Sequence, residues 1–339
     1  MTAARETRVY TAQDDQQIVV HSLSDTDGSL VELGRTRVTG GSSFLAIDAA
    51  GSRGAAVLEG GDEIVGLRFA PGSGVVTEAG MRRSSRGGGP THVSLDVTGR
   101  WALLANYGGG TIASYALDDA GALSASADDE SPGARAHQIV TTPSNSWALV
   151  PCLGADHVAV LAFDAARGTL MPSSTRSADP GAGPRHLAIT ADGRFVYVNN
   201  ELDSTLDVLS FDDATGALAH LQTVSTLPAG FSGANSTAEI ALGPGERFVY
   251  VSNRGHDSIA IFAIGADHRV EARGHARLEA RRPRSFAIDP AGRWLLAGAQ
   301  DDDVVVSFRI EADGSLTRTV TSATTGSPTF VGAFAIPRE

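Results

Sequence analysis

Short apolar runs separated by polar turns recur along the whole chain and predict many short β-strands. In one region the predicted strands are, in order, His186–Thr190, Phe195–Asn200, Thr205–Phe211 and a run near Ala217–Val224. The segment Phe195–Val198 is apolar on both faces, which is typical of a strand buried between two sheets. Turns rich in Asp and Gly, such as Asp192-Gly193, separate the runs and mark hairpins. We therefore expect a four-stranded antiparallel unit.

The same unit repeats along the chain, and an aromatic residue after its first turn marks each copy. These aromatic residues are Trp101, Trp147, Phe195, Phe248 and Trp294, at intervals of 46, 48, 53 and 46 residues. A weaker copy begins at Ser43, which makes six units. Four-stranded units of about 40 to 50 residues are typical of β-propeller blades.

A seventh blade can be assembled from the two ends of the chain. The segment Pro328–Val331 resembles the start of a unit, and nothing after it completes that unit. The runs that could complete it are Arg8–Tyr10, Gln17–Ser22 and Leu30–Arg35. Such a closure leaves no free sheet edge. We predict an all-β fold, a seven-bladed β-propeller of four-stranded antiparallel blades with the ring closed by both termini, as one domain over residues 1–339. The alternative is a β-solenoid that does not close.

The repeats also separate structural positions from functional ones. The start of the first strand of a hairpin lies beside the end of the second, so these positions share one end of every blade. Residues that recur there in each unit are structural, whereas charges and imidazoles found in only some units are functional candidates. Because first strands line the central channel, these side chains should meet at one mouth of it. The predicted set is His92, Asn106, Tyr107, His137, Arg185, His186, Asn200, Glu201, Glu239, Asn253, Arg254 and Arg284.

Gathering so many polar groups is unfavourable unless a ligand binds there. Several arginines favour an anionic ligand, because guanidinium groups hold carboxylate or phosphate through paired hydrogen bonds. Asn106, Asn200 and Asn253 recur between units, so capping of loops is an alternative role for them. Cys152 falls at the same mouth, and we expect no role for it.

Composition and charge narrow the choice of function. The chain has 339 residues, a formal net charge of −12 and 42% apolar residues, as in an ordinary globular protein. The acidic balance argues against nucleic acid or an anionic membrane as a partner. All 27 basic residues are arginine, which excludes a lysine Schiff base and a Walker phosphate loop. A single cysteine excludes an internal disulfide and a multi-cysteine metal site.

Neither targeting nor metal binding is expected from the pattern. No apolar stretch approaches the roughly 18 residues that span a bilayer. Residues 1–8 lack the apolar core of a signal peptide, so we expect a cytoplasmic location. The nine histidines are scattered without a three-ligand zinc pattern, so we expect no metal and no other cofactor.

Motifs about one blade apart carry a resemblance to a known family. They are Asn106-Tyr107-Gly108-Gly109-Gly110, Gly183-Pro184-Arg185-His186, Asn200-Glu201-Leu202-Asp203-Ser204 and Ser252-Asn253-Arg254-Gly255-His256-Asp257-Ser258. With them the chain resembles the seven-bladed β-propeller lactonase family, which contains bacterial propeller-type 6-phosphogluconolactonases and fungal carboxymuconate-lactonizing enzymes. The resemblance covers almost the whole chain and implies metal-free chemistry on a lactone ring. It places His137, Arg185, Glu201 and Arg254 at catalytic positions. The chain departs from the family at Cys152, where many relatives carry Asp before Leu-Gly.

Three functions remain open. The first is hydrolysis of a sugar-acid lactone, in which Glu201 or His137 takes a proton from water and arginines stabilise the oxyanion. Further arginines, Arg284 among them, would then hold a phosphate or carboxylate of the substrate. The second is lactonization of a muconate-type diacid by the same groups, as in a cycloisomerase. The third is a non-catalytic binding propeller, which would be favoured if the arginines paired fully with acids of the chain.

The expected partner follows from the same residues. It is a small anionic lactone or dicarboxylate, and the absence of an aromatic-rich mouth favours a polar, sugar-like molecule. We expect no nucleic acid and no membrane as partners, and a monomer or weak homo-oligomer.

Overall fold

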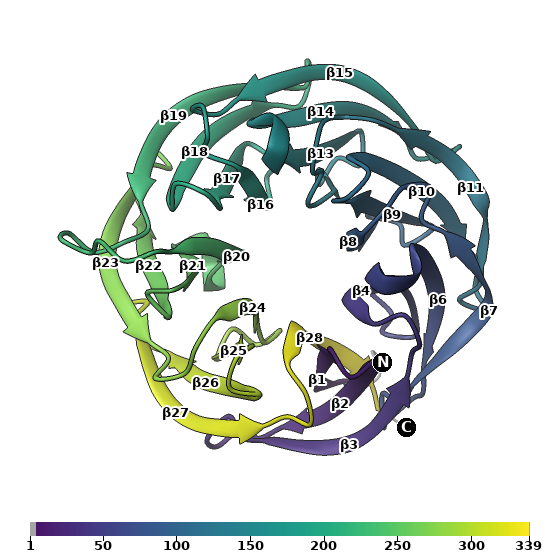
Figure 1. Cartoon of the computed structure of the whole chain (residues 1–339), viewed down its shortest axis with the longest axis horizontal. Helices are drawn as coiled ribbons and strands as arrows, with labels where there is room; N and C mark the ends of the chain where they lie inside the picture. The colour runs from purple at the N-terminus through teal and green to yellow at the C-terminus, as the bar shows by residue number, and fades with distance from the viewer. Residues whose placement is uncertain (1–4, 339) are drawn as a thin grey trace.

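The computed structural model describes residues 5–338, which form seven four-stranded antiparallel sheets arranged as blades around a central axis (Figure 1). The predicted all-β, seven-bladed propeller is confirmed. Residues 1–4, which carry part of the expectation that no signal peptide is present, lie outside the described residues. Between residues 5 and 338 there is no helix with the length and apolar character needed to cross a bilayer.

Six blades are consecutive in sequence, and each runs from the axis outwards. Their innermost strands are β4 (Ser42–Ile47), β8 (Pro90–Leu95), β12 (Val140–Thr141), β16 (Pro184–Ile189), β20 (Ser236–Leu242) and β24 (Pro283–Ile288). The second strands are β5 (Arg53–Leu58), β9 (Trp101–Asn106), β13 (Trp147–Cys152), β17 (Phe195–Asn200), β21 (Phe248–Arg254) and β25 (Trp294–Ala299). The strand predicted at Phe195–Asn200 thus has the predicted bounds.

The outer strands complete these blades. The third strands are β6 (Glu63–Phe69), β10 (Thr111–Leu117), β14 (His157–Asp164), β18 (Thr205–Asp212), β22 (Ser258–Ile264) and β26 (Val304–Ile310). The fourth strands are β7 (Val76–Ser84), β11 (Leu123–Glu130), β15 (Thr169–Ser177), β19 (Ala217–Ser225), β23 (Val270–Arg277) and β27 (Leu316–Ala323). Short 3₁₀ helices occur at η1 (Glu59–Gly61), η2 (Leu153–Ala155) and η3 (Pro244–Glu246).

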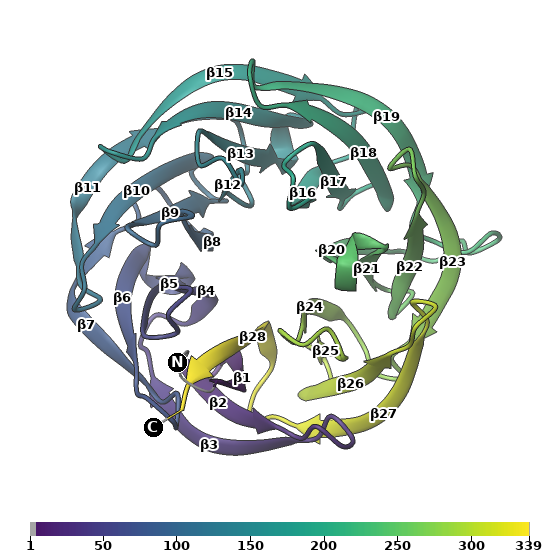
Figure 2. The same cartoon turned by 180° about the vertical axis from the view of Figure 1, so that it is seen from behind.

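The seventh blade combines both ends of the chain, as the sequence predicts. Its strand order is β28 (Pro328–Pro337), β1 (Arg5–Gln13), β2 (Gln17–Leu23) and β3 (Leu30–Arg37). β28 and β1 pair from Arg5 opposite Pro337 to Gln13 opposite Pro328. Figure 2 shows the first and last strands of the chain, β1 and β28, side by side in this blade. The pairing leaves no free edge at the junction, where an open ring would otherwise separate.

The recurring turn between the first two strands of a blade has a simple physical cause. The Asp96 carboxylate accepts hydrogen bonds from the backbone amides of Arg100 and Trp101 at 2.8 and 2.9 Å. Gly99 adopts a φ of +68° inside this turn, a conformation that favours glycine. The Asp289 carboxylate makes the same contacts to the amides at positions 293 and 294. The repeated Asp, Gly and aromatic residues therefore belong to the turn and the core, at the end of the propeller away from the predicted mouth.

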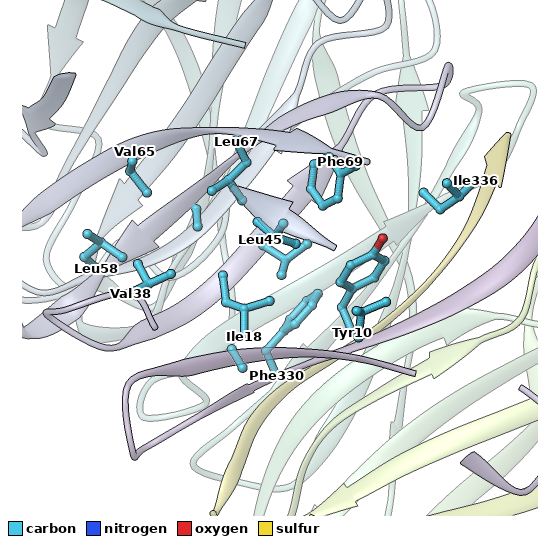
Figure 3. Close-up of a cluster of buried hydrophobic side chains, with 14 residues drawn as sticks. Tyr10, Ile18, Val38, Leu45, Leu58, Val65, Leu67, Phe69, Phe330 and Ile336 are labelled. Atoms are coloured by element: carbon cyan, nitrogen blue, oxygen red, sulfur yellow. The ribbon is translucent and has the colours of Figure 1, made fainter. Parts of the chain in front are cut away.

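Neighbouring blades pack through apolar side chains, and one such cluster joins the closing blade to the first repeat. Figure 3 shows Tyr10, Ile18 and Phe330 of the closing blade against Leu45 and Val65 of the next. All five are at most 3% exposed. The C-terminal strand therefore contributes to the packing of the blades as well as to the hydrogen-bonded ladder.

We expect the substitution Phe330→Ala to lower the free energy of unfolding by about 3 to 5 kcal/mol, because it leaves a cavity in this cluster. Equilibrium denaturation by urea, followed by tryptophan fluorescence, measures the change. The control is Met171→Ala, since Met171 is 65% exposed on β15 and should change stability by less than about 0.5 kcal/mol. Equal effects of the two substitutions would contradict the packing role of β28.

Candidate active site

A β-bulge at the start of the innermost strands controls which side chains face the channel. In β16, Pro184 pairs with Asn200 and His186 with Asn199, so Arg185 is an extra residue without a partner in the ladder. The equivalent extra residues in four other blades are Ser43, Thr91, Arg284 and Thr329. Strict alternation would send Arg185 and His186 to opposite faces of the sheet. The bulge re-aims the strand, so that both residues reach the same cluster of side chains.

The carboxylate of Glu201 lies between two guanidinium groups from neighbouring blades. Its Oε2 atom is 2.9 Å from Nε of Arg185 and 3.0 Å from Nη2 of Arg254. The side chain of Arg185 is 3% exposed, that of Arg254 10% and that of Glu201 20%. Backbone carbonyls support both cations: Arg185 donates to Ala238, and Arg254 donates to Thr237 at 2.8 Å. One carboxylate thus faces two positive charges, and the pair of arginines is only partly neutralised.

The buried arginine is held under electrostatic strain. Burial, together with the like charge of Arg254, lowers the pKa of Arg185 to about 9. The guanidinium is still charged at neutral pH. Among the residues that the structure describes, neither Nε of Arg185 nor Nε of Arg254 has a well-aligned hydrogen-bond acceptor, although Glu201 is close to the first of them. Buried guanidinium groups that are only partly neutralised favour the binding of an additional negative charge beside them.

Arg284 adds a further cation at the same mouth. It is half-buried, and within residues 5–338 its guanidinium has no ion pair and no hydrogen bond. Its positive charge contributes to lowering the pKa of both Arg254 and His137, which places it beside them. The arginines of the mouth are therefore not fully paired with acids, and the condition that would favour a non-catalytic propeller is not met.

Three histidine rings form a layer beneath these cations. The ring centroids of His137 and His186 are 5.0 Å apart, and those of His92 and His186 are 5.6 Å apart. Burial lowers the pKa of all three rings, and Arg185 adds to this effect for each of them. His186 is also tied to Glu239, whose Oε1 lies 2.8 Å from its Nδ1. The imidazoles are neutral at pH 7, which is the form that can accept a proton.

The predicted asparagines lie at the ends of second strands, but their amides are already engaged. Nδ2 of Asn106 donates to the Ser85 carbonyl and that of Asn253 to the Thr226 carbonyl, both at 2.8 Å. Nδ2 of Asn200 donates to a nearby threonine hydroxyl at 2.9 Å. These contacts match the loop-capping role that the repeats suggested as an alternative, and a role in substrate binding stays a prediction.

Arg135 and Asn199, near the histidines, were missed by sequence reasoning. The predicted residue Tyr107 packs edge-on against His137 with centroids 5.6 Å apart, and the guanidinium of Arg135 lies 5.5 Å from the Tyr107 ring. Arg135 is exposed and precedes His137 by two residues, which is the signal that could have drawn attention to it. Asn199 accepts a hydrogen bond from the His186 amide at 3.2 Å and so helps to fix the bulged strand.

The expectation that Cys152 lies at the mouth is wrong. Cys152 ends β13 at the strand position that Asn106 and Asn200 occupy in their blades. It is 0% exposed and belongs to an apolar cluster between blades. Burial raises the pKa of its thiol to about 12. The replacement of the family's acid by cysteine therefore changes the interior of the blade rather than the mouth.

Two cavities flank the cluster. One, of about 420 Å³, is lined by Arg254, Arg281, Arg282, Asp257, Asp301 and the segment 234–236. The other, of about 330 Å³, lies along the channel, with Phe44, Phe286, Phe330, His92 and Glu239 among its lining residues. The first is lined mainly by charged and polar residues and adjoins the arginines, whereas the second is largely apolar and ends at the histidine layer. No group of three or more His, Cys, Asp or Glu side chains that could hold a metal ion occurs in the described part of the chain.

Comparison with known proteins defines the class. The family model described as Lactonase, 7-bladed beta-propeller matches residues 8–333. The chain therefore belongs to the seven-bladed β-propeller lactonase family, in agreement with the resemblance found in the sequence.

Individual relatives span almost the whole chain. A 6-phosphogluconolactonase of Yersinia pestis is 34% identical over 316 residues, which is 91% of this chain and 92% of the relative. A 6-phosphogluconolactonase of Serratia proteamaculans is 31% identical over 314 residues, covering 91% and 93%. Among solved structures, the periplasmic gluconolactonase PpgL of Pseudomonas aeruginosa is 27% identical with a TM-score of 0.89, covering 98% of this chain and 99% of that one.

We expect Cys152 to be unreactive in the native protein, because the thiol is buried and its pKa is raised to about 12. Reaction with a chromogenic disulfide at pH 8 should release no thiolate from native protein and one equivalent after denaturation in guanidinium chloride. Rapid labelling of the native protein would instead place the thiol in contact with solvent at the mouth.

Proposed function

We propose that the chain is a lactonase that hydrolyses a sugar-acid lactone, in the manner of a 6-phosphogluconolactonase, at a metal-independent Arg/His/Glu site at one mouth of the central channel. The observation that carries this proposal is the pair of guanidinium groups on one Glu201 oxygen, beside the neutral imidazole of His137. The names of the relatives support a lactone hydrolase. Muconate lactonization gains no support from these relatives and is kept as a competing outcome of the assay.

The geometry favours His137 over Glu201 as the base. Oε2 of Glu201 already contacts two guanidinium groups, so its lone pairs are engaged and less able to accept a proton. Among residues 5–338, no carboxylate or guanidinium group is bound to the His137 ring, and burial lowers its pKa, which keeps the ring neutral at pH 7. A neutral imidazole can take a proton from a water molecule as the water oxygen attacks the lactone carbonyl carbon. General base catalysis of this kind contributes roughly 10² to 10⁴-fold in rate.

The arginines stabilise the charge that forms in this step. The attack turns the carbonyl oxygen into an oxyanion, and guanidinium N–H groups of Arg254 would donate to it, while Arg284 would hold the phosphate or another anionic group of the substrate. A donor aimed at an oxyanion contributes roughly 10² to 10³-fold. Arg185 is more deeply buried than Arg254 and acts by holding Glu201 and by its charge.

The second half of the reaction returns the proton. As the oxyanion collapses, the bond between the carbonyl carbon and the ring oxygen breaks. The departing ring oxygen takes the proton from the His137 imidazolium and becomes a hydroxyl. The product is an open-chain sugar acid, whose carboxylic proton passes to solvent and whose carboxylate is repelled by Glu201.

We expect a panel assay to show hydrolysis of 6-phosphogluconolactone or gluconolactone above the spontaneous rate. A pH-stat follows acid release, and loss of ultraviolet absorbance follows muconate. Glu201→Gln should lower kcat/KM by about 10²-fold, because the two arginines lose their anionic partner and shift. The control is Glu246→Gln, since Glu246 is bound to the Ala191 amide in a turn at the other end of the blade. Turnover of muconate without lactone hydrolysis, or no turnover of any substrate, would contradict the proposal.

We expect Arg284→Ala to raise KM by about 10-fold or more with a smaller change in kcat, because a charged hydrogen bond to the substrate contributes about 1.5 to 3 kcal/mol. The effect should be larger for the phosphorylated lactone than for the unphosphorylated one. Steady-state kinetics with both substrates measures it. Arg309→Ala is the matched control, because Arg309 is exposed and paired with Glu311. An unchanged KM for both lactones would remove Arg284 from the binding site.

A further inference from the structure

Within the described part of the chain, two buried nitrogen atoms in the histidine layer have no hydrogen-bond partner. They are Nδ1 of His137 and Nε2 of His186. His137 is 5% exposed and His186 2%. A buried polar atom without a partner is unfavourable by about 1 to 3 kcal/mol and calls for a physical reason. The two atoms belong to adjacent rings, which suggests a common reason.

The hydrogen-bond partners of His186 determine the state of its free nitrogen. Oε1 of Glu239 lies 2.8 Å from Nδ1 of His186 and also accepts from the Ile240 amide at 3.1 Å. A carboxylate only accepts hydrogen bonds, so Nδ1 of His186 carries the hydrogen. Nε2 of the same neutral ring is then a free acceptor. The Glu239 amide donates to Ser252 Oγ at 2.9 Å, which fixes the residue that orients the ring.

The spacing of the rings suits a hydrogen bond between them. Two imidazoles joined by an N–H···N bond of about 2.9 Å have ring centroids about 5 Å apart. The centroids of His137 and His186 are 5.0 Å apart, with the ring planes inclined by 68°. A donor at Nδ1 of His137 would satisfy both unpartnered atoms at once.

We propose that Nδ1–H of His137 donates directly to Nε2 of His186 after a small ring rotation, so that Glu239 and His186 are positioning residues for His137. This inference rests on the proposed function, in which His137 is the base. With its hydrogen on Nδ1, His137 keeps the lone pair of Nε2 for the water molecule. An acid that orients a histidine in this way also stabilises the imidazolium formed in the reaction.

The surrounding charges explain why such support is needed. The groups that face His137 are His186, the Tyr107 ring and the guanidinium groups of Arg185, Arg254 and Arg284. All three cations oppose a positive charge on His137. Glu239 is the acid that reaches this ring through a histidine. It offsets part of the repulsion when His137 is protonated.

His92 is the competing donor to His186. Its ring centroid is 5.6 Å from that of His186, against 5.0 Å for His137. Its Nδ1 accepts from the Ile139 amide at 3.5 Å, so its hydrogen is on Nε2. The shorter separation and the second unpartnered atom favour His137, and the two donors can be separated by experiment.

The test uses nitrogen-15 NMR of histidine-labelled protein, with signals assigned by single histidine substitutions. Wild-type protein at pH 7 should show His137 with a protonated Nδ1 and an unprotonated Nε2. Glu239→Gln offers an amide that can donate to His186, so the His137 tautomer should change in part or fully. Glu246→Gln should leave the His137 signals unchanged. A wild-type His137 with its hydrogen on Nε2 would overturn the proposal without any variant.

Kinetics provides a second readout on the same proteins. Glu239→Gln should lower kcat about 10 to 100-fold with KM changed less than about 2-fold, as for other residues that orient a reacting group. Loss of the negative charge should also lower the pKa of His137, so the acid limb of the kcat/KM profile should move to lower pH. A merely structural role would lower stability and leave this limb in place.

The outcomes separate the inference from the function on which it rests. An active wild-type enzyme whose His137 tautomer is unaffected by Glu239→Gln overturns the inference alone. A change confined to the His92 signals in that variant identifies His92 as the donor and overturns it as well. Wild-type protein without lactonase activity removes the proposed function, while the NMR spectrum still decides the hydrogen-bond assignment.

Discussion

A partial hoop of hydrogen bonds from bulged residues links four pairs of neighbouring blades at the channel, and the arrangement of the site depends on it. At four of the five bulges named above, the side chain donates to the backbone of the next blade, whereas within residues 5–338 Arg284 makes no such bond. Ser43 donates to Pro90 at 2.9 Å, Thr91 donates to His137 at 3.2 Å, and Arg185 donates to Ala238. Thr329 of the closing strand donates to Ser42 at 3.3 Å, which carries the hoop across the junction of the two chain ends. The closure of the ring thus fixes the relative positions of side chains from separate blades.

The same geometry sets the electrostatics of the mouth. The hoop brings buried cations together with the Glu201 carboxylate, and burial lowers the pKa of Arg185 to about 9. Beyond the histidines the channel is apolar. The ring centroid of Phe44 lies 4.3 Å from that of His92 and 4.5 Å from that of Phe330. The apolar side keeps water from the imidazoles and keeps them neutral, while the polar side supplies donors for an anion. A site with a neutral base on one side and unsatisfied cations on the other suits chemistry in which negative charge develops on an oxygen.

Much of this architecture could be predicted from the sequence, because aligning the repeats shows which residues occupy equivalent positions in each blade. The aromatic residue after each turn located the second strands, and β17 has the predicted bounds. The antiparallel hairpin rule then placed Arg185, Glu201 and Arg254 at one end of the molecule. The burial of the Cys152 side chain could not be predicted in this way. Proximity to the end of a strand says nothing about which face its side chain takes, and Cys152 turns into the apolar core.

The bulges were also beyond sequence reasoning, and they explain how two consecutive residues contribute to one site. A regular strand would send Arg185 and His186 to opposite faces of the sheet, so that only one of them could reach the site. The extra residue leaves the ladder on either side intact, so its side chain can change without altering the register. The bulged residue is serine or threonine in β4, β8 and β28, where its side chain only links neighbouring blades. It is arginine in β16 and β24. A propeller of identical blades can therefore acquire a specific anion site by substitution at these positions, since the backbone that presents them is stabilised by the closed ring.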